Sequence, residues 1–491
     1  MLKDTPTTIA IIGGGFSGCM VAAHLLHRAT RPLNIKLIER QTQLGRGVAY
    51  KTRCSAHLLN VPAGKISAFP DHPDHFLNWL QRLQKEGCTD ELNPGWSAGP
   101  EAFVPRKLYG DYIEEILGEA EASASNHVQL ERLTNEAIAI HPTTVKGPSA
   151  AMGGATLYLR NNQTLQVDKI VLALGNFPPS DPRVGDPSFY KSRRYRRSAW
   201  SADALTGLNS TEPVLLIGSG LTAIDLAISL KEQGHQGLIQ VVSRHGLLPQ
   251  SHRPTEPYPS FLDATFPYTI SALMQKVRQE VRGAAMQGHD WRAVIDTLRP
   301  LTQELWQSLS QVERRRFLRH LRPYWEVHRH RIAPQVAKQI NDLLRSGQLV
   351  FHAGRIQSYQ EDCERVEVVL HKRHTREQIR LWASRVINCT GPECDYRKFH
   401  HPLITSLCQQ GLLRSDALGL GLDVATNGAL IDANGNASRL LFTLGPLRKG
   451  NLWETTAVPE LRIQAFALAQ ELLRHQSLQK SESVLVRQMG G

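Results

Sequence analysis

Short apolar runs that end in a glycine-rich turn occur twice along the chain, and an Ala- and Leu-rich stretch follows each turn. The first run covers residues 9–12 and the second covers residues 214–217. Short runs of β-branched and leucine residues bounded by glycine predict buried strands, and the apolar spacing after each turn predicts a helix. The pattern therefore predicts two strand–turn–helix units.

The glycine spacing of both turns is typical of dinucleotide binding. The first glycine permits a tight bend, the second lets the backbone approach a pyrophosphate, and the third position packs the helix against the strand. The helix start adds free N–H groups and a positive dipole end for the phosphates. One such turn is a weak signal, but two in the same context predict two bound dinucleotides. The residues expected to contact them are Gly13, Gly15, Phe16, Ser17 and Gly18 at the first turn, and Gly218, Ser219, Gly220, Leu221 and Thr222 at the second.

The residues that close the next strand of each unit differ in charge. The first unit has Glu39 and Arg40 at this place, whereas the second has Ser243, Arg244 and His245. A carboxylate accepts hydrogen bonds from an unmodified ribose, while an arginine suits the extra 2′-phosphate of NADP. We therefore expect FAD at the first turn and NADPH at the second.

The order of the elements predicts an α/β fold with two Rossmann-like dinucleotide-binding domains. Each unit is followed by strand-like runs that suit a β-meander and by a strand that returns to a glycine. We place a split FAD domain in residues 1–205 and 391–491, with the NADPH domain, residues 206–390, inserted in it. The expected strands are 128–133, 137–141, 155–161 and 169–174 in the first domain, and 349–352, 355–360, 365–371, 378–382 and 385–389 in the second.

An added helical lobe is expected at about residues 249–347, between the second turn and its meander. Such an insertion either covers the flavin and forms the substrate pocket or only buries its own core. In the first domain we expect helices at 74–84, with Asp74 as the N-cap, and at 106–121. The helical runs of the lobe are 269–282, 291–299, 303–310, 312–321 and 334–346.

Three basic residues of the lobe are candidate substrate contacts. At helical spacing His328 and Arg331 share one face, and Arg329 lies on another. Such a cluster suits a carboxylate-bearing substrate or the phosphates of a cofactor. The alternative is a solvent-exposed basic helix end.

The C-terminal segment adds a second group of expected flavin contacts. An apolar run at residues 440–445 leads into a loop, and Pro459 begins a long helix, because proline is favoured at the first helical position. The start of this helix would stabilise negative charge on the reduced flavin ring. Asn60 as a turn residue and Trp453 as a core aromatic are the alternatives. The expected contacts are Arg46, Leu59, Asn60 and Val61 in the loop after the first strand pair, and Gly445, Asn451, Trp453 and Thr456 before the final helix.

Composition and charge narrow the function classes. The 491 residues carry a net charge of +12 and seven scattered cysteines, and no run is long enough to cross a membrane. We expect a cytoplasmic protein with reduced thiols and no secretory leader. Neither nucleic acid nor a membrane is an expected partner, because no recognition motif accompanies the basic charge. No metal is expected, since the Asp and His residues at 71–75 suit a loop and helix cap. The sequence leaves the oligomeric state open, a homo-oligomer included.

With these motifs in hand, the chain resembles the two-nucleotide flavoproteins that include flavin-containing and N-hydroxylating monooxygenases. Within them it is most similar to the YdhS-like FAD/NAD(P)-binding proteins. The resemblance implies FAD bound by the first and last segments and NAD(P)H bound by the middle one. The motifs that carry it are GGGFSG from Gly13, GRGVAY from Gly45, LLNVPAGKISAFPDHPDHFLNWL from Leu58, GSGLTAIDLA from Gly218, SRHGLLPQSH from Ser243, YWEVHRHRIAP from Tyr324 and LGPLRKGNLWETTAVPELRIQA from Leu444.

The cofactors indicate the reaction class. We expect an oxidoreductase that uses NADPH to reduce FAD and then transfers oxygen from a flavin C4a-hydroperoxide to a small amine or amino acid. The cofactor performs the difficult step, so no catalytic side chain is assigned from the sequence. The alternatives are an NADPH-dependent flavin reductase or dehydrogenase without oxygen transfer, and a flavin-bound protein that binds a partner.

Overall fold

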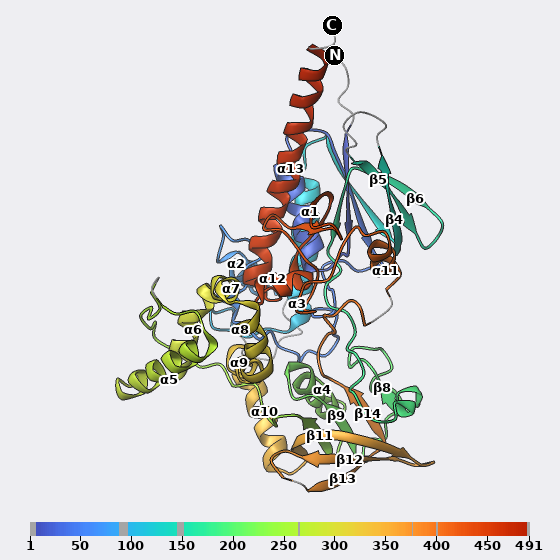
Figure 1. Cartoon of the computed structure of the whole chain (residues 1–491). Helices are drawn as coiled ribbons and strands as arrows, with labels where there is room; N and C mark the ends of the chain where they lie inside the picture. Colours follow the sequence, from blue (N-terminus) through green and yellow to red (C-terminus); the bar gives the residue numbers. More distant parts are fainter. Residues whose placement is uncertain are drawn as a thin grey trace. The chain divides into compact units, whose positions relative to one another are not determined.

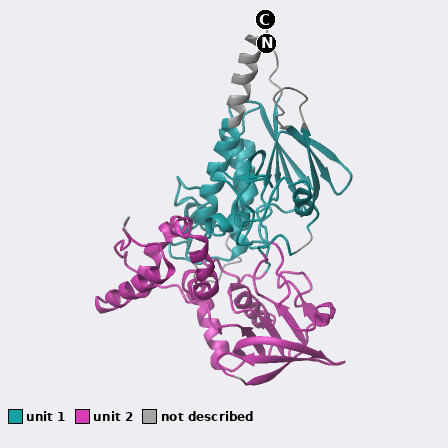
Figure 2. Cartoon of the chain, in the orientation of Figure 1, with its two compact units in different colours: residues 1–53, 62–176, 394–491 teal, residues 54–61, 177–393 magenta. Residues whose placement is uncertain are grey.

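A computed structural model describes residues 6–87, 97–144, 152–263, 266–375, 377–398 and 401–488, with the side chains of 144, 152 and 475–488 left undescribed. The chain forms two compact units (Figure 2). Unit 1 contains residues 1–53, 62–176 and 394–491, and unit 2 contains residues 54–61 and 177–393. Each unit has its own large sheet, as the predicted pair of Rossmann-like domains requires.

The large sheet of unit 1 has six strands in the order β15-β16-β7-β1-β2-β3. All neighbours are parallel except β15 and β16. The apolar residues at 9–11 are fully buried because the sheet is covered on both faces. Helix α1 (Phe16–Arg28) contacts both α3 (Arg106–Ala122) and α13 (Val458–Gln488) (Figure 1). The strands are β1 (Thr7–Ile12), β2 (Leu33–Glu39), β3 (Val128–Thr134), β7 (Lys169–Leu172), β15 (Ala429–Ile431) and β16 (Ala437–Thr443).

A smaller antiparallel sheet of unit 1 consists of β4 (Ala137–Thr144), β5 (Met152–Leu159) and β6 (Thr164–Val167). The expected meander is therefore present, but the run at 128–133 does not belong to it. This run forms β3 and pairs in parallel with β2, because strand partners depend on contacts that are distant in sequence. Helix α2 (His75–Lys85) begins after Asp74, which occupies the N-cap position but makes no side-chain capping bond. Helix α11 (Pro402–Gln409) packs against β4.

The sheet of unit 2 has seven strands in the order β13-β12-β11-β10-β9-β14-β8. Strand β11 is one continuous strand where two were expected. Its first part pairs in parallel with β10, and its second part pairs antiparallel with β12. The change of partner occurs at Gly354, where an added Cβ would lie 2.5 Å from His371 O. The strands are β8 (Tyr195–Arg196), β9 (Val214–Ile217), β10 (Ile239–Ser243), β11 (Leu349–Glu361), β12 (Val366–Lys372), β13 (Gln378–Ala383) and β14 (Arg385–Asn388).

The helical lobe of unit 2 follows β10. Three of its helices have side-chain N-caps, because the hydroxyls of Thr269 and Ser310 and the carboxylate of Asp290 accept backbone N–H groups of the first turns. The expected single helix at 312–321 is instead α8 followed by a π-helical turn, Phe317–Leu321. The lobe helices are α5 (Ile270–Met286), α6 (Trp291–Leu298), α7 (Thr302–Ser308), α8 (Gln311–Arg316), α9 (Arg322–Arg329) and α10 (Pro334–Arg345).

The boundaries of the compact units differ from the expected domain boundaries. Residues 177–205 group with unit 2 because β8 pairs in parallel with β14 at the edge of the second sheet. The segment 54–61 also groups with unit 2, although its flanking residues belong to unit 1. A two-residue edge strand and a short loop segment carry little periodicity, so the sequence pattern does not reveal either one.

Candidate functional site

The first glycine turn lies at the carboxyl end of β1, between β7 and β2. Gly13 has φ +111°, and a Cβ at this position would lie 2.2 Å from Ala173 O. A Cβ on Gly18 would lie 1.8 Å from Gly13 O. Both positions therefore require glycine, in agreement with the roles of tight turn and helix packing.

The start of α1 is available to an anion. Gly15 is the N-cap and provides no side-chain acceptor, and the first turn carries no acidic residue. Phe16 is buried and stacks on Tyr109 with ring centroids 6.2 Å apart, so its side chain supports the turn from inside unit 1. Ser17 is half-buried, and its Oγ lies 3.4 Å from the Cβ position of Gly445. This geometry fits a pyrophosphate at the helix start.

Glu39 is held beside the turn at the end of β2. Its carboxylate accepts hydrogen bonds from Gly14 N at 2.7 Å and from Gln41 N at 3.2 Å. Glu39 is half-buried, whereas the neighbouring Arg40 is exposed. A fixed acceptor at this position suits a ribose hydroxyl. Gly14 is a further requirement that the spacing argument missed, because a Cβ there would lie 2.5 Å from Leu44 Cδ2.

The loop after β2 packs onto the same turn. Gly45 N donates to Gly14 O at 2.8 Å, and the Cβ position of Gly15 is 3.4 Å from Gly47 Cα. Arg46, an expected flavin contact, is buried with its guanidinium directed at α3. It donates to three acceptors, Lys107 O at 3.0 Å, Asp111 Oδ1 at 2.6 Å and Glu114 Oε2 at 3.0 Å. Arg46 therefore anchors the loop to α3, and the two flanking glycines approach the turn.

Gly445 follows β16 and is bound by a buried polar network. Its N–H donates to Gln464 Oε1 at 3.0 Å, and its carbonyl accepts from Thr455 Oγ1 at 2.9 Å. Gln464 Nε2 also donates to Thr455 Oγ1 at 2.8 Å. The sequence did not indicate Thr455 or Gln464, although Gln464 lies two helical turns into α13. The network fixes the loop that precedes α13 to the glycine beside Ser17.

Trp453 occupies a strained backbone position between α12 (Lys449–Leu452) and α13. It has φ 60° and ψ −70°, and Glu454 N donates to Leu452 O at 2.7 Å. These features define a γ-turn of the rare, strained form, which costs on the order of 1–3 kcal/mol. The indole is buried, Asn451 is half-buried and Thr456 is exposed. Strain of this size gathers at ligand sites, which supports the expected role of this loop.

The three remaining expected flavin contacts lie in unit 2. Leu59 is buried, while Asn60 and Val61 are half-buried. His252 Nε2 lies 2.9 Å from Asn60 O and fixes the backbone of this segment. Their grouping with unit 2 separates them from the other expected flavin contacts, all of which lie in unit 1.

The second glycine turn repeats the geometry of the first. Gly218 has φ +106°, and its Cβ position lies 2.7 Å from Cys389 O, the carbonyl that follows the returning strand β14. Gly220 is the N-cap of α4 (Leu221–Glu232), and among the described residues nothing lies within 4 Å of its Cβ position. Leu221 and Thr222 are half-buried. The start of α4 is thus also available to an anion.

A hydroxyl pair joins the second turn to the end of β10. Ser219 Oγ lies 2.9 Å from Ser243 Oγ and 2.6 Å from Leu247 O. Ser243 Oγ also accepts a hydrogen bond from Gly246 N at 3.0 Å. The two serines therefore shape the loop that presents Arg244 and His245.

Basic side chains gather at the end of β10. The His245 ring contacts the guanidinium of Arg373, and Arg244 is exposed. Burial of the ring lowers the pKa of His245, and the positive charges of Arg373, Arg244, His374 and Arg355 lower it further. We call these four residues the basic cluster. The sequence indicated only Arg244, because the other three lie on β11 and in the β12–β13 turn. The cluster suits a phosphate monoester.

Two of the three candidate substrate residues of the lobe, His328 and Arg331, contact Trp291. Arg331 is 3% exposed, donates to Asp296 Oδ2 at 2.9 Å and lies 5.2 Å above the indole. His328 Nδ1 lies 2.7 Å from Tyr324 O, and its ring meets the same indole edge-on at 4.8 Å. Arg329 is half-buried. The structure thus brings His328 and Arg331 together but commits the guanidinium of Arg331 to the lobe itself.

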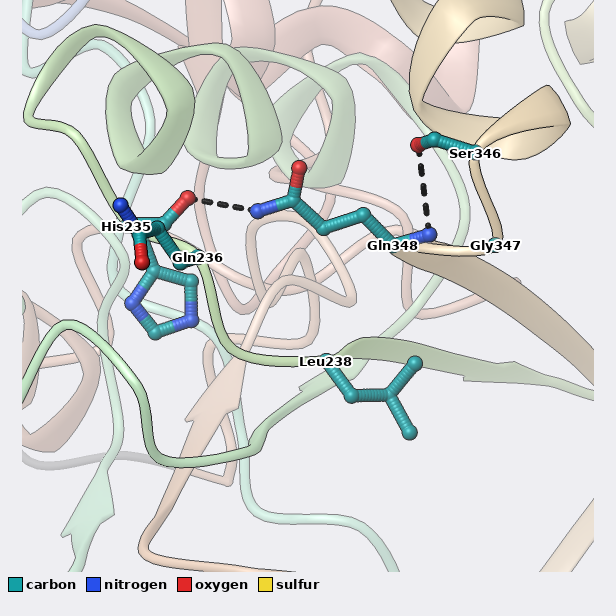
Figure 3. Close-up of a pocket in the computed structure, with 6 residues that line it drawn as sticks. All are labelled: His235, Gln236, Leu238, Ser346, Gly347 and Gln348. Carbon is teal, nitrogen blue, oxygen red and sulfur yellow. Dashed lines mark hydrogen bonds between the residues drawn. The ribbon is translucent and has the colours of Figure 1, made fainter.

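A pocket in unit 2 lies at the amino ends of β10 and β11, away from the glycine turn at the carboxyl end of β9. It is lined by residues that precede β10 and β11, and Gln348 Nε2 donates to His235 O at 2.5 Å (Figure 3). Nucleotides bind at the carboxyl ends of parallel strands. We therefore do not assign either cofactor to this pocket. The lining residues are His235, Gln236, Leu238, Ser346, Gly347 and Gln348.

The part of the chain that the structure describes shows no candidate for a membrane helix or a metal cluster. None of its helices combines the length and the apolar character needed to cross a membrane. Within the same ranges, no three His, Cys, Asp or Glu side chains are grouped closely enough to hold a metal ion.

The chain is similar to known FAD-NAD(P)-binding proteins. Residues 10–177 match the family model of FAD-NAD(P)-binding proteins. An L-aspartate N-monooxygenase (nitrosuccinate-forming) of Streptomyces cremeus is 24% identical over an alignment of 244 residues, and this alignment covers 44% of this chain and 36% of that protein. The chain therefore spans about a third of the length of this curated relative.

Two solved structures share the fold over nearly the whole chain. The reduced form of an ornithine hydroxylase from Pseudomonas aeruginosa has a TM-score of 0.63 at 15% identity, over 96% of this chain and all of that chain. An L-lysine 6-monooxygenase from Pseudomonas syringae has a TM-score of 0.63 at 15% identity, over 96% of this chain and 99% of that one. The chain has the fold of the two-dinucleotide flavoproteins, and residues 10–177 form an FAD/NAD(P)-binding domain, which confirms these expectations.

Proposed function

We propose that this chain is an FAD- and NADPH-dependent monooxygenase that hydroxylates the nitrogen of a small amine or amino acid with molecular oxygen. The observation that carries the proposal is the contrast between the two glycine turns. Both present an open helix start, but a fixed carboxylate stands beside the first and the basic cluster beside the second. The proteins of similar fold named above hydroxylate ornithine or lysine, and the relative of partial length acts on L-aspartate.

Unit 1 is the proposed FAD site. The pyrophosphate would lie at the start of α1, with Glu39 on the ribose and the loop from Gly445 to Thr456 near the flavin ring. FAD, when bound, accepts a hydride from NADPH and activates oxygen. Buried hydrogen bonds join Gly445, Thr455 and Gln464, so the loop would present a fixed surface to the ring.

Unit 2 is the proposed NADPH site. The start of α4 would bind the pyrophosphate, and the basic cluster would bind the 2′-phosphate. Several guanidinium groups at one point favour NADPH over NADH, because NADH offers no charge to pair with them.

The proposed substrate class rests on the proteins of similar fold. The contacts within the lobe limit which of its side chains can bind a substrate. The guanidinium of Arg331 is paired with Asp296, so Arg331 is a weaker candidate for binding a substrate carboxylate than its place in the sequence predicted. We also propose that the chain is of the YdhS-like type, on its motifs. A cytoplasmic location stays a prediction from the sequence, which leaves the oligomeric state open.

The test is a panel of amines and amino acids assayed for NADPH oxidation, oxygen uptake and hydroxylamine product. We expect one substrate class to give all three in equal amounts. Rapid NADPH oxidation with peroxide release for every compound would contradict oxygen transfer and favour the flavin reductase. If neither NADPH nor NADH reduces the flavin, the remaining interpretation is a flavin-bound protein that binds a partner.

A further inference from the structure

The segment 54–61 contains a cysteine and a histidine whose side chains meet. His57 N donates to Cys54 O at 3.2 Å, so the two residues are the first and last of a reverse turn. The turn brings their side chains to the same side, where the thiol and the imidazole form a hydrogen bond. Cys54 is partly exposed, whereas His57 is only 4% exposed. A half-buried thiol thus lies against an almost fully buried base.

Helix α4 fixes the orientation of the histidine ring. His57 Nε2 lies 2.8 Å from Asp225 O and 2.8 Å from Ser229 Oγ. A carbonyl oxygen can only accept, so Nε2 carries the ring proton and Nδ1 is left to accept the thiol proton. The edge of the ring also meets Trp200, with centroids 6.1 Å apart. The backbone carbonyl of Asp225 therefore orients His57, and His57 can act as the base that activates the Cys54 thiol.

The surroundings of the pair shift the pKa values of the thiol and of the imidazole toward each other. Burial lowers the pKa of His57, but the bond from Cys54 and the carboxylate of Asp225 outweigh it and raise the pKa overall. Burial raises the pKa of Cys54 and Glu232 opposes its ionisation, yet the bond to His57 and the Ala56 N–H lower the pKa overall. Three of the other described thiols differ from Cys54, since burial raises the pKa of Cys19, Cys389 and Cys408.

We propose that Cys54 is a reactive thiol, activated by His57, and that a hydroperoxide such as hydrogen peroxide oxidises it to a sulfenic acid. The sulfur attacks one peroxide oxygen, the O–O bond breaks, and the second oxygen leaves as water after taking the proton held by His57. The sulfur loses two electrons and the peroxide gains them. This modification site uses no residue assigned to either cofactor, so it does not depend on the proposed function.

The first test measures alkylation of the intact protein by iodoacetamide across pH 6–9, with each cysteine followed by peptide mass spectrometry. Cys363 is the internal control, because it is exposed and lies in the same unit. We expect Cys54 to react faster than Cys363 at pH 7, and the His57→Gln variant to slow Cys54 by roughly tenfold while leaving Cys363 unchanged. Glutamine keeps a donor for Asp225 O but cannot hold the thiol proton.

The second test exposes the wild-type protein to hydrogen peroxide with dimedone as the trap for sulfenic acid. We expect the dimedone adduct on Cys54 before any on Cys363. Equal or faster modification of Cys363 in either test would overturn the proposal, because exposure alone would then set reactivity. So would a His57→Gln variant that folds and keeps the wild-type rate. If that variant does not fold, the pH profile of wild-type Cys54 against Cys363 decides the question.

Discussion

Glu39 and Arg244 hold equivalent places, each at the end of the second parallel strand of its unit, and they differ in charge. Glu39 is fixed by two backbone N–H groups, whereas Arg244 stands among other cations. The charge of one residue at this position favours one cofactor over another only if neighbouring residues do not neutralise that charge. Here the neighbours strengthen the contrast, since the basic cluster adds Arg355, Arg373 and His374.

The first prediction concerns Arg373, which the sequence did not indicate. Replacing it with alanine should lower kcat/KM for NADPH by roughly tenfold to a hundredfold, because a charged hydrogen bond to the 2′-phosphate is lost. The kcat/KM for NADH should stay near that of the wild type. The control is the neighbouring variant Lys372→Ala, which should keep both values because the Lys372 ammonium pairs with Glu377. Steady-state kinetics with both nicotinamides would measure this, and an equal loss for NADH would contradict it.

At the scale of elements, the first glycine of each turn approaches the residue that follows the returning strand of its unit. Gly13 approaches the carbonyl of Ala173 after β7, and Gly218 approaches that of Cys389 after β14. The sequence could predict the turns, the helices and the apolar strands, because these are local patterns. It could not predict that β3 joins β2, nor that Thr455 and Gln464 bind Gly445, because those contacts join distant residues.

The second prediction follows from the packing of α1 on its own turn. Gly18→Ala would place a Cβ 1.8 Å from Gly13 O, so we expect a lower Tm and loss of FAD from the purified protein. Gly118 on α3 is the matched control, since nothing among the described residues lies within 4 Å of its Cβ position. Gly118→Ala should keep its FAD and gain up to about 1 kcal/mol from helix propensity. Equal losses would show that packing at Gly18 is not the cause.

The third prediction concerns Lys169, which begins β7 and is 5% exposed. Burial lowers its pKa from 10.5 to about 8, although Glu471 and Asp168 oppose the shift. The unfolded chain therefore binds more protons between those values, and stability should rise as the pH increases from about 8 to 10.5. Lys169→Met should raise the free energy of unfolding at pH 7 by on the order of 2 kcal/mol and flatten this rise.

Urea unfolding of the two proteins at pH 7 and at pH 10 would measure the effect of Lys169. The control is Lys65→Met, at an exposed lysine of the same unit. The expectation fails if Lys169→Met lowers stability at pH 7, or if the wild type loses stability across the same pH range.

At the scale of the whole molecule, the two compact units each carry one complete glycine turn with its sheet. We therefore predict that the cofactor sites can be lost separately. The Gly18→Ala variant should bind 2′,5′-ADP with an unchanged Kd in calorimetry, because Gly220 and the basic cluster belong to unit 2. Arg373→Ala should keep its FAD but bind 2′,5′-ADP more weakly. Loss of both ligands in either variant would contradict independent sites.

The grouping of segment 54–61 with unit 2 has a consequence for the order in which the chain folds during synthesis. Every residue of unit 2 has been made once residue 393 is complete, whereas unit 1 still lacks β15, β16 and α13. Unit 2 can thus fold first and include the segment 54–61, with His57 already packed against α4. The large sheet of unit 1 must wait for its last strands, so a ribosome stalled once residue 393 has left the exit tunnel should carry a folded unit 2 and an unfinished unit 1.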